Sequence, residues 1–344
     1  MSFRAVLAGC GNMSKGWLTA IAESALVVGR VEIVGLVDLD LATAQTRAAE
    51  FGLTNVAVGT DIDALLSQTK PDLLFDVVVP VARRAVVEAG LCHGCHVLSE
   101  KPMANSLSDG KSLVELAAKV GRIHAIIQNR RFVAGVRRIR QLIKSGALGK
   151  LSSLNCDFFV GAHFGGFRDE MENPLLLDMS IHTMDAARFM ADKLPQAVYC
   201  LETNPNGSWY THGGAANAIF ELSDNVVFNY RGSWCAEGAT TSWESAWRII
   251  GSKGTLIWDG ADHFEAKVVA NDTGFLRELR FIDVPAPAND AQTHGHASVL
   301  AEFLDAVETG RKPETDSSDN INSLAMVFGA IESAKSHRRV EISI

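Results

Sequence analysis

Short apolar runs alternate with longer amphipathic segments along the first part of the chain. A short uninterrupted apolar run is typical of a strand buried on both faces, whereas the longer segments carry apolar residues at helical spacing. Strands that alternate with helices in this way predict a parallel, doubly wound sheet in an α/β domain. The predicted strands are 5–8, 31–37, 56–58, 73–79 and 96–98, and helix-like segments include 15–25, 62–68 and 82–89.

The strict alternation stops after about Gly121, where a series of strand-like runs begins. We therefore expect two domains, 1–122 and 123–344, which also suits a length of 344 residues. Two closing helices, 297–309 and 322–335, are expected around a polar loop, and they can pack back on the first domain. The strand-like runs of the second domain are 153–160, 197–203, 216–222, 226–234, 247–251 and 255–258.

The composition excludes several classes of protein. The net charge is −8 and the basic residues are scattered, so the chain lacks the basic surface that nucleic-acid binding requires. No apolar run is long enough to span a bilayer, and residues 1–4 lead into a strand without the pattern of a signal peptide. We expect a cytoplasmic protein with a small-molecule partner and with neither a nucleic-acid nor a membrane partner.

The cysteines and one histidine pair do not indicate a metal or redox centre. Six cysteines in a chain of this length do not form a disulfide framework. Cys92 and Cys95 belong to a C-x-x-C-H sequence that matches covalent haem attachment, but it falls between a predicted helix and strand and lacks an export signal. We expect ordinary thiols there. His294 and His296 lack spaced Cys or carboxylate partners, so we expect a solvated loop or a pocket rim and no metal.

A glycine-rich turn follows the first predicted strand and opens a helix-like segment. Its sequence, from Gly9 to Ser14, is G-x-G-x-x-S, which in this strand–turn–helix context is typical of dinucleotide binding. Gly9 permits the tight turn, and Gly11 lets the backbone approach a pyrophosphate. Asn12 and Met13 open the helix, whose free N–H groups and dipole favour an anion. The turn predicts a Rossmann domain that binds NAD or NADP.

The second predicted strand ends in Asp38, at the distance expected for a carboxylate that binds the adenosine ribose. The alternative is that Asp38 caps the helix that follows. A carboxylate about 4 Å from a 2′-phosphate charge repels it by up to ~4 kcal/mol at an effective dielectric near 20. No Arg or Lys lies within 39–45 to receive that phosphate. We expect NAD, with NADP less suited, and we expect Gly9, Asp38, Pro80 and Glu100 to lie at the carboxyl ends of the strands.

Two further motifs carry groups suited to acid–base chemistry. Glu100-Lys101-Pro102 follows the strand 96–98, where a lysine at the lip of the nucleotide crevice could bind a substrate hydroxyl; the alternative is a solvated surface charge. Asp178 and His182 are four residues apart, so on a helix they share one face. A carboxylate there orients an imidazole and stabilises its charged form. The alternative is a structural Asp–His pair.

Together these motifs closely resemble the glucose–fructose oxidoreductase/inositol dehydrogenase (Gfo/Idh/MocA) family. The family's glycine turn matches 9–14, and its A-G-x-H-V-x-x-E-K-P segment matches 89–90 and, after a short insertion, 96–102. The resemblance covers nearly the whole chain, because it continues through 129–132, 148–149 and 177–185 and ends near 333–334. Three departures are Arg84 where a His is common, the insertion around 92–95, and 172–175 in place of a glycine-rich approach to Asp178.

The resemblance implies an NAD-dependent oxidoreductase that transfers a hydride between nicotinamide and a hydroxyl-bearing carbon of a sugar, inositol or related polyol. Lys101, Asp178 and His182 match the family's catalytic set. In those roles His182 exchanges the hydroxyl proton, Lys101 orients and polarises the reacting oxygen, and Asp178 supports His182 or binds substrate. The resemblance also implies a second domain with an open, largely antiparallel sheet flanked by helices, and a homodimer or homotetramer.

The substrate side of the site is less specific. Candidate substrate-binding residues besides the catalytic set are Asn129, His163 and Arg168, with Phe164 and Trp234 nearby in the predicted loops and strand ends. Arg168 either binds a hydroxyl or carboxylate or forms a surface ion pair. Two alternative functions stay open within the resemblance, an NAD-assisted glycosidase or a carbonyl or imine reductase. A third is a regulator that senses NAD or sugar without catalysis.

Overall fold

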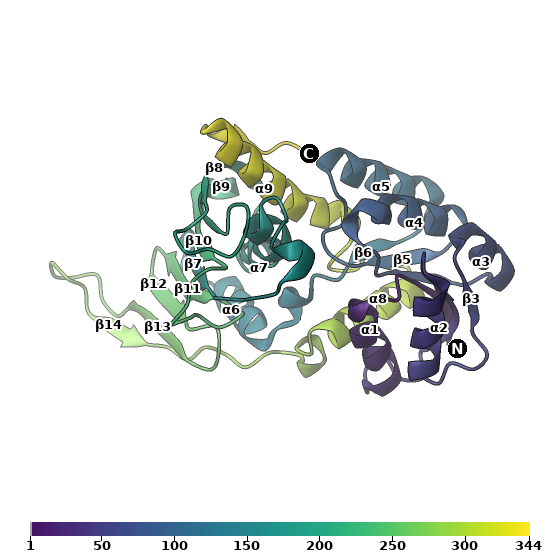
Figure 1. Cartoon of the computed structure of the whole chain (residues 1–344). Coiled ribbons are helices and arrows are strands. Elements are labelled where there is room, and N and C mark those ends of the chain that lie inside the picture. Colours follow the sequence, from purple (N-terminus) through teal and green to yellow (C-terminus); the bar gives the residue numbers. More distant parts are fainter. Residues whose placement is uncertain (1) are drawn as a thin grey trace. The chain divides into compact units, whose positions relative to one another are not determined.

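The computed structural model describes residues 2–344 and divides into two compact units (Figure 1). The first unit comprises the residues up to Asn129 together with His294–Leu324. The second comprises Arg130–Thr293 and Ala325–Ile344. No helix among residues 2–344 is long and apolar enough to cross a membrane.

The first unit contains a six-stranded parallel sheet with the order β3-β2-β1-β4-β5-β6. This confirms the predicted doubly wound sheet, and the order is that of a dinucleotide-binding domain, in which the strand order reverses beside β1. Central residues such as Ala5, Leu74 and Val97 are fully buried, as continuous apolar runs require. The strands are β1 (Phe3–Ala8), β2 (Val31–Val37), β3 (Ala57–Gly59), β4 (Leu73–Asp76), β5 (His96–Ser99) and β6 (His124–Ile126).

Helices cover both faces of this sheet, with α1 and α2 on one face and α3, α4 and α5 on the other (Figure 1). Their starts follow from local sequence. Asp40 and Asp61 accept first-turn N–H groups of α2 and α3, and Pro80 occupies the first position of α4. The helices are α1 (Asn12–Glu23), α2 (Leu41–Glu50), α3 (Ile62–Thr69), α4 (Pro80–Cys92) and α5 (Leu107–Val120).

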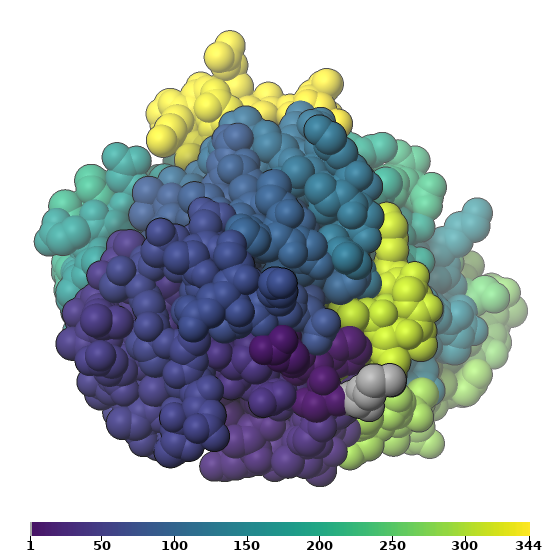
Figure 2. All heavy atoms as spheres, turned by 90° about the vertical axis from the view of Figure 1, so that its right-hand side faces the viewer, coloured from purple at the N-terminus to yellow at the C-terminus, as the bar shows by residue number. Residues whose placement is uncertain are grey.

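Two elements join the first unit from beyond residue 122, where the sequence placed the domain boundary. β6 extends the sheet by pairing with β5, and three residues are too few to show a period in the sequence. Helix α8 (His296–Thr309) packs beside α1, and Arg30 pairs with Asp305 at 2.7 Å. Figure 2 shows the yellow-green residues that include α8 on the surface beside the purple N-terminal residues.

The second unit is built on a nine-stranded sheet with the order β14-β13-β12-β11-β7-β10-β9-β8-β15. All neighbours are antiparallel except β7 and β10, which confirms the expected open, largely antiparallel sheet. The strands are β7 (Leu151–Phe159), β8 (Pro195–Thr203), β9 (Ala215–Leu222), β10 (Val226–Ser233), β11 (Ala246–Gly251), β12 (Gly254–Trp258), β13 (Phe264–Val269), β14 (Leu279–Phe281) and β15 (Val340–Glu341).

Burial alternates along the strands of this sheet, as expected when helices cover a single face. The covered face carries α6 (Ala134–Lys144), α7 (Ile181–Ala191) and the second half of α9 (Ser317–Ser336) (Figure 1). An open groove runs over the other face, lined by residues that include Tyr199, Leu201 and Ile219. A π-helical segment (Leu175–Ser180) leads into α7, and short 3-10 turns occupy Asn129–Phe132, Gly166–Arg168, Ser223–Asn225 and Asp290–Gln292.

Candidate active site

The two glycines of the turn after β1 are required for different reasons. Gly9 has a φ of +91°, and a Cβ on it would lie 2.7 Å from the carbonyl carbon and oxygen of Val77. Gly9 therefore lets this turn pass directly against the backbone that follows β4. Gly11 has an ordinary φ of −68°, and a Cβ on it would meet nothing within 4 Å among the described residues. The missing side chain at Gly11 leaves open space at the start of α1.

Helix α1 begins at Asn12 without a side-chain cap from Gly11. The first N–H groups of a helix have no partner inside it, so those of Asn12 and Met13 can serve an anion. Ser14, which stands where a third glycine is common, is fully buried and its hydroxyl donates to Gly11 O at 2.6 Å. The small serine thus fits the close packing of α1 on the sheet.

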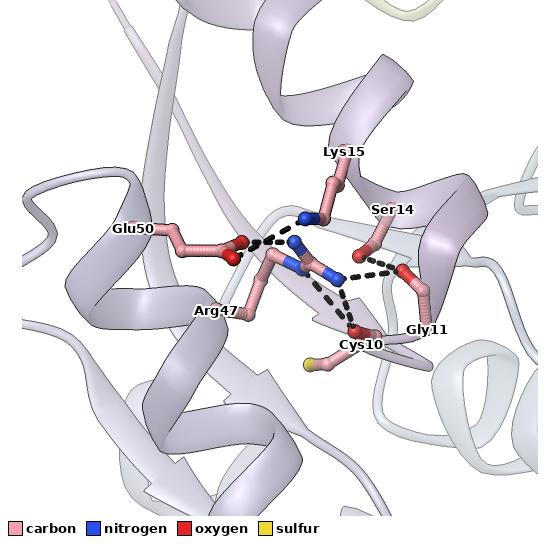
Figure 3. A network of polar contacts seen from close by, with 6 residues as sticks. All are labelled: Cys10, Gly11, Ser14, Lys15, Arg47 and Glu50. Carbon is pink, nitrogen blue, oxygen red and sulfur yellow. Dashed lines mark hydrogen bonds and ion pairs between the residues drawn. The ribbon is translucent and has the colours of Figure 1, made fainter.

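Arg47 of α2 hydrogen-bonds to the backbone of this turn (Figure 3). The residue is 6% exposed, and its guanidinium donates to Cys10 O at 3.2 and 3.0 Å and to Gly11 O at 3.0 Å. It also pairs with Glu50, which accepts a second contact from Lys15 at 3.2 Å. Arg47 could not be predicted from the sequence, because it follows the strand by ten residues and helix geometry decides which side chain of α2 reaches the turn.

Asp38 also binds the backbone of this turn. It follows β2, and its Oδ2 accepts the Cys10 N–H at 2.7 Å while its Oδ1 accepts the Asp40 N–H at 3.0 Å. The residue that caps α2 is Asp40, so the alternative interpretation of Asp38 as a helix cap is wrong. Asp38 and Arg47 together fix both the N–H and the C=O of Cys10.

Large apolar side chains are exposed around this turn. Met13, Leu39 and Leu41 follow β1 and β2, and Val79 and Val81 follow β4. Leu39 is 91% and Val81 77% exposed. An apolar rim beside an anion-binding helix start is what a dinucleotide needs, because its rings are flat and its diphosphate is charged. The residues present therefore fit the cofactor that the sequence predicts.

Glu100 lies buried at the end of β5. Its Oε1 accepts the indole N–H of Trp17 at 2.9 Å and its Oε2 accepts the Lys101 N–H at 3.1 Å. The Nε2 of His296, the first residue of α8, lies 3.8 Å from Oε1. Burial alone would raise the pKa of Glu100, but the facing His296 and Trp17 and the charge of Lys101 lower that pKa below its ordinary value.

The Glu-Lys-Pro turn is also tied to β4. Arg83 of α4 is 1% exposed, and its Nε donates to the buried Asp76 at 2.8 Å. Its other nitrogens donate to Val78 O at 2.6 Å and to Pro102 O. Pro80, expected to bind cofactor, starts the helix that supplies this arginine. Arg84, the departure noted in the sequence, lies on the surface with Glu88 and Asp109.

In the second unit, Asp178 lies in the π-helical segment and His182 in the first turn of α7. The two residues therefore do not lie on one regular α-helix, because the wider turn adds a residue to the helical ladder just before α7. Such π turns occur frequently at functional sites. Asp178 Oδ2 accepts the Nε–H of Arg168 at 3.0 Å, so Arg168 forms the partly exposed ion pair that the sequence left as an alternative.

Aromatic rings surround Arg168 and the neighbouring loop. The Arg168 guanidinium lies 5.0 Å from the rings of both Phe164 and Phe167. His163 stacks on Trp209 with 3.6 Å between ring centroids, and its Nε2 lies 2.7 Å from Glu237. Trp234 is 2% exposed, so it is a core residue behind Phe164 rather than a residue of an open pocket.

A small cavity lies beside His182. Its walls include Met179, Trp243 and the ion pair between Arg130 and Glu244. Burial lowers the pKa of Arg130 to about 10, which leaves the guanidinium charged at neutral pH. Sequence reasoning missed this pair, because its members are more than 100 residues apart along the chain.

The cysteine motif and the histidine pair do not gather metal ligands. Within residues 2–344, no three His, Cys, Asp or Glu side chains are grouped so that they could hold a metal ion. Cys95 is buried, which raises the pKa of its thiol to about 11, whereas Cys92 is exposed. His93 pairs with Asp63 at 2.9 Å.

Two family models match the chain. Residues 3–128 match the oxidoreductase family with an NAD-binding Rossmann fold, and residues 136–257 match the GFO/IDH/MocA C-terminal domain. Together they cover more than two thirds of the chain.

Similar proteins and structures cover almost the full length. A D-apiose dehydrogenase from Paraburkholderia graminis is 22% identical over 99% of this chain and 90% of its own. A 1,5-anhydro-D-fructose reductase from Ensifer adhaerens is 24% identical over 98% and 97%. The structure of an Agrobacterium radiobacter oxidoreductase with NAD+, L-tartaric acid and magnesium has a TM-score of 0.85 at 21% identity, covering 99% of both chains. The Bordetella pertussis WlbA dehydrogenase with NADH and UDP-GlcNAcA has a TM-score of 0.82 at 19% identity, covering 100% of both.

The two matched models follow one another along the chain and correspond to the parallel and the antiparallel sheet. The glycine turn, clamped between Asp38 and Arg47, lies inside the first of them. This protein therefore belongs to the GFO/IDH/MocA family of oxidoreductases, whose first domain has the NAD-binding Rossmann fold.

Proposed function

We propose that this protein is an NAD-dependent dehydrogenase that transfers a hydride between nicotinamide C4 and a hydroxyl-bearing carbon of a sugar, inositol or related polyol. The observation that carries the proposal is one unit that holds both a dinucleotide turn, fixed by Asp38 and Arg47, and the turn that bears Lys101. Similar proteins named as dehydrogenases of D-apiose and D-xylose support a polyhydroxylated substrate.

The choice of NAD over NADP rests on Asp38. Its carboxylate is held at the end of β2 by two backbone N–H groups, so it cannot turn away from a ribose bound there. Repulsion of a 2′-phosphate about 4 Å away reaches ~4 kcal/mol at an effective dielectric near 20, and half of that still exceeds the ~1.4 kcal/mol of a tenfold preference. Arg47 is buried against the turn and Glu50, so its guanidinium binds protein groups and is not placed to receive a 2′-phosphate.

The side chains of this chain manage the substrate oxygen and its proton. The nicotinamide, when bound, accepts or donates the hydride. Lys101 hydrogen-bonds and polarises the reacting oxygen, and His182 takes up or returns the hydroxyl proton. Asp178, which accepts the Nε–H of Arg168, either supports His182 or accepts a substrate hydroxyl.

A screen of NAD reduction across aldoses, inositols and sugar acids tests the proposal. We expect turnover with at least one of them, and we expect Lys101→Ala and His182→Ala each to lose most of it while NAD binding is retained. Near-normal turnover in both variants would reject this catalytic set. NAD binding without turnover of any substrate would favour a sensor, and hydrolysis of a glycoside without net NADH would favour the glycosidase.

We further propose a homodimer or homotetramer assembled through the open face of the second unit's sheet. Tyr199, Leu201 and Ile219 on that face are 47%, 44% and 52% exposed, and such an apolar patch on strands β8 and β9 is typical of a contact between subunits. Ile219→Asp should shift the mass measured by light scattering toward the monomer. An unchanged mass would exclude this face.

A further inference from the structure

Glu100 is a buried carboxylate that needs hydrogen-bond donors to remain charged. Trp17 supplies one to Oε1 at 2.9 Å and the Lys101 backbone supplies one to Oε2 at 3.1 Å. His296 is a further polar group beside the carboxylate, 3.8 Å from Oε1, which is within ion-pair range but longer than a hydrogen bond. The side chain of residue 296 thus faces the residue that immediately precedes Lys101.

Asn129 determines how His296 is oriented. Its Nδ2 lies 3.2 Å from the imidazole Nδ1. With the amide as donor, Nδ1 is the acceptor, and the proton of the neutral imidazole is on Nε2, the nitrogen that faces Glu100. Asn129 and Glu100 therefore favour the same tautomer. Three segments far apart in sequence, at 100, 129 and 296, meet in this arrangement.

We propose that His296 is a positioning residue for Lys101, acting through the carboxylate of Glu100. The side chains of Trp17 and His296 face the same oxygen of Glu100, and the other oxygen binds the backbone of Lys101. Displacing the carboxylate therefore shifts the peptide from which the Lys101 side chain projects. A shift of this kind lowers the rate of hydride transfer, because the lysine contacts the reacting oxygen over a short range. The inference rests on the proposed function, in which Lys101 is catalytic.

A histidine that only packs at the start of α8 would behave differently. Its removal would destabilise the helix, and any other side chain of similar volume would restore the fold and the rate together. A positioning role instead requires an N–H donor facing Glu100. His296→Gln keeps such a donor on a side chain of similar reach, whereas His296→Leu keeps volume alone.

Kinetics at saturating NAD distinguish these roles, with the best substrate from the screen. We expect His296→Leu to lower kcat about tenfold, the equivalent of about 1.4 kcal/mol in the barrier, while the Kd for NAD stays within twofold. We expect His296→Gln to recover most of kcat. His93→Gln is the matched control, because His93 belongs to the same unit but pairs with surface Asp63. Unchanged kcat in His296→Leu, or equal loss in the Gln and Leu variants, would overturn the proposal.

The indole N–H of Trp17 gives a readout that does not depend on turnover. It is assigned in a proton–nitrogen NMR spectrum by its loss in Trp17→Phe. We expect its resonance to move in His296→Leu, to return toward the wild-type position in His296→Gln, and to be unaffected in His93→Gln. An unchanged Trp17 resonance in His296→Leu would overturn the inference. If this resonance moves in His296→Leu but no substrate is turned over, the proposed function fails, while the coupling of His296 to Trp17 through Glu100 is retained.

Discussion

Arg47 offers a direct test of how the dinucleotide turn is held. Arg47→Met keeps much of the aliphatic volume and removes the guanidinium that donates to the carbonyl oxygens of Cys10 and Gly11. The turn then keeps its contacts to Asp38, to Val37 O through the Gly9 N–H, and to the Ser14 hydroxyl. We expect the backbone N–H groups at the start of α1 to lose their fixed arrangement toward the diphosphate.

The magnitude follows from the three hydrogen bonds of 3.0 to 3.2 Å that are lost. A hydrogen bond from a charged donor contributes a net ~1.5–3 kcal/mol, and the turn can recover part of this by hydration because it lies beside exposed residues. We expect the free energy of NAD binding to weaken by about 1.4–3 kcal/mol, a tenfold to roughly hundredfold rise in Kd.

Calorimetric titration of NAD, with thermal unfolding as a parallel measurement, gives the result. Arg47→Lys should be intermediate, because an ammonium keeps the charge but lacks the planar fork that spans two carbonyls. Arg30→Met is the matched control, since Arg30 precedes β2, at the end of that strand opposite Asp38, and pairs with Asp305. A folded Arg47→Met variant that binds NAD within twofold of wild type would refute the reasoning.

Three further predictions concern the same unit. Asp38→Asn should raise the NADP-to-NAD ratio of kcat/KM, because it removes the charge and keeps an acceptor for the Cys10 N–H; an unchanged ratio would remove Asp38 from the ribose site. Gly9→Ala should lower the unfolding free energy by about 2 kcal/mol or more, since φ is +91° and Val77 is 2.7 Å from the added Cβ. Gly11→Ala should instead keep the unfolding free energy and weaken NAD binding. Equal melting temperatures for the two variants would contradict this prediction. The pKa of Glu100 is lowered on folding from an ordinary 4.5, so its stabilisation is present above that pH and is lost as pH falls through the folded pKa. Glu100→Gln should therefore lose stability at pH 7 and lose less on acidification, as denaturant melts at several pH values would show.

The parallel sheet was predictable because its strands are buried on both faces and appear as continuous apolar runs. Two edge strands, β6 and β14, were not. β6 is three residues long, and all three residues of β14 are exposed, so neither carries a period that sequence can show. The strand predicted for 73–79 ends at Asp76, because the apolar residues that follow carry the backbone past Gly9 and on to α4.

Candidate site residues could be named from the sequence where a motif directly follows a predicted strand. Gly9, Asp38 and Lys101 each follow a strand, and parallel strands bring their carboxyl ends to one edge. Arg47 and Arg83 were missed, and His296 was expected only in a solvated loop or a pocket rim, because each contacts a partner that only the fold brings near. The π turn at Asp178 was missed for a different reason. It widens one turn of the backbone hydrogen-bond ladder, and the four-residue spacing of Asp178 and His182 in the sequence does not reveal this.

The chain passes between the two units at three points, after Asn129, after Thr293 and after Leu324. Neither unit is therefore a continuous stretch of sequence that can be excised. A fragment ending near residue 129 would lack α8 and with it Asp305, which pairs with Arg30, and His296, which faces Glu100. A chimera that exchanges the second unit for that of a relative needs both Arg130–Thr293 and Ala325–Ile344 from the same donor, with the intervening segment retained from the host. The last of those junctions falls inside α9, so a graft there must also preserve helical register.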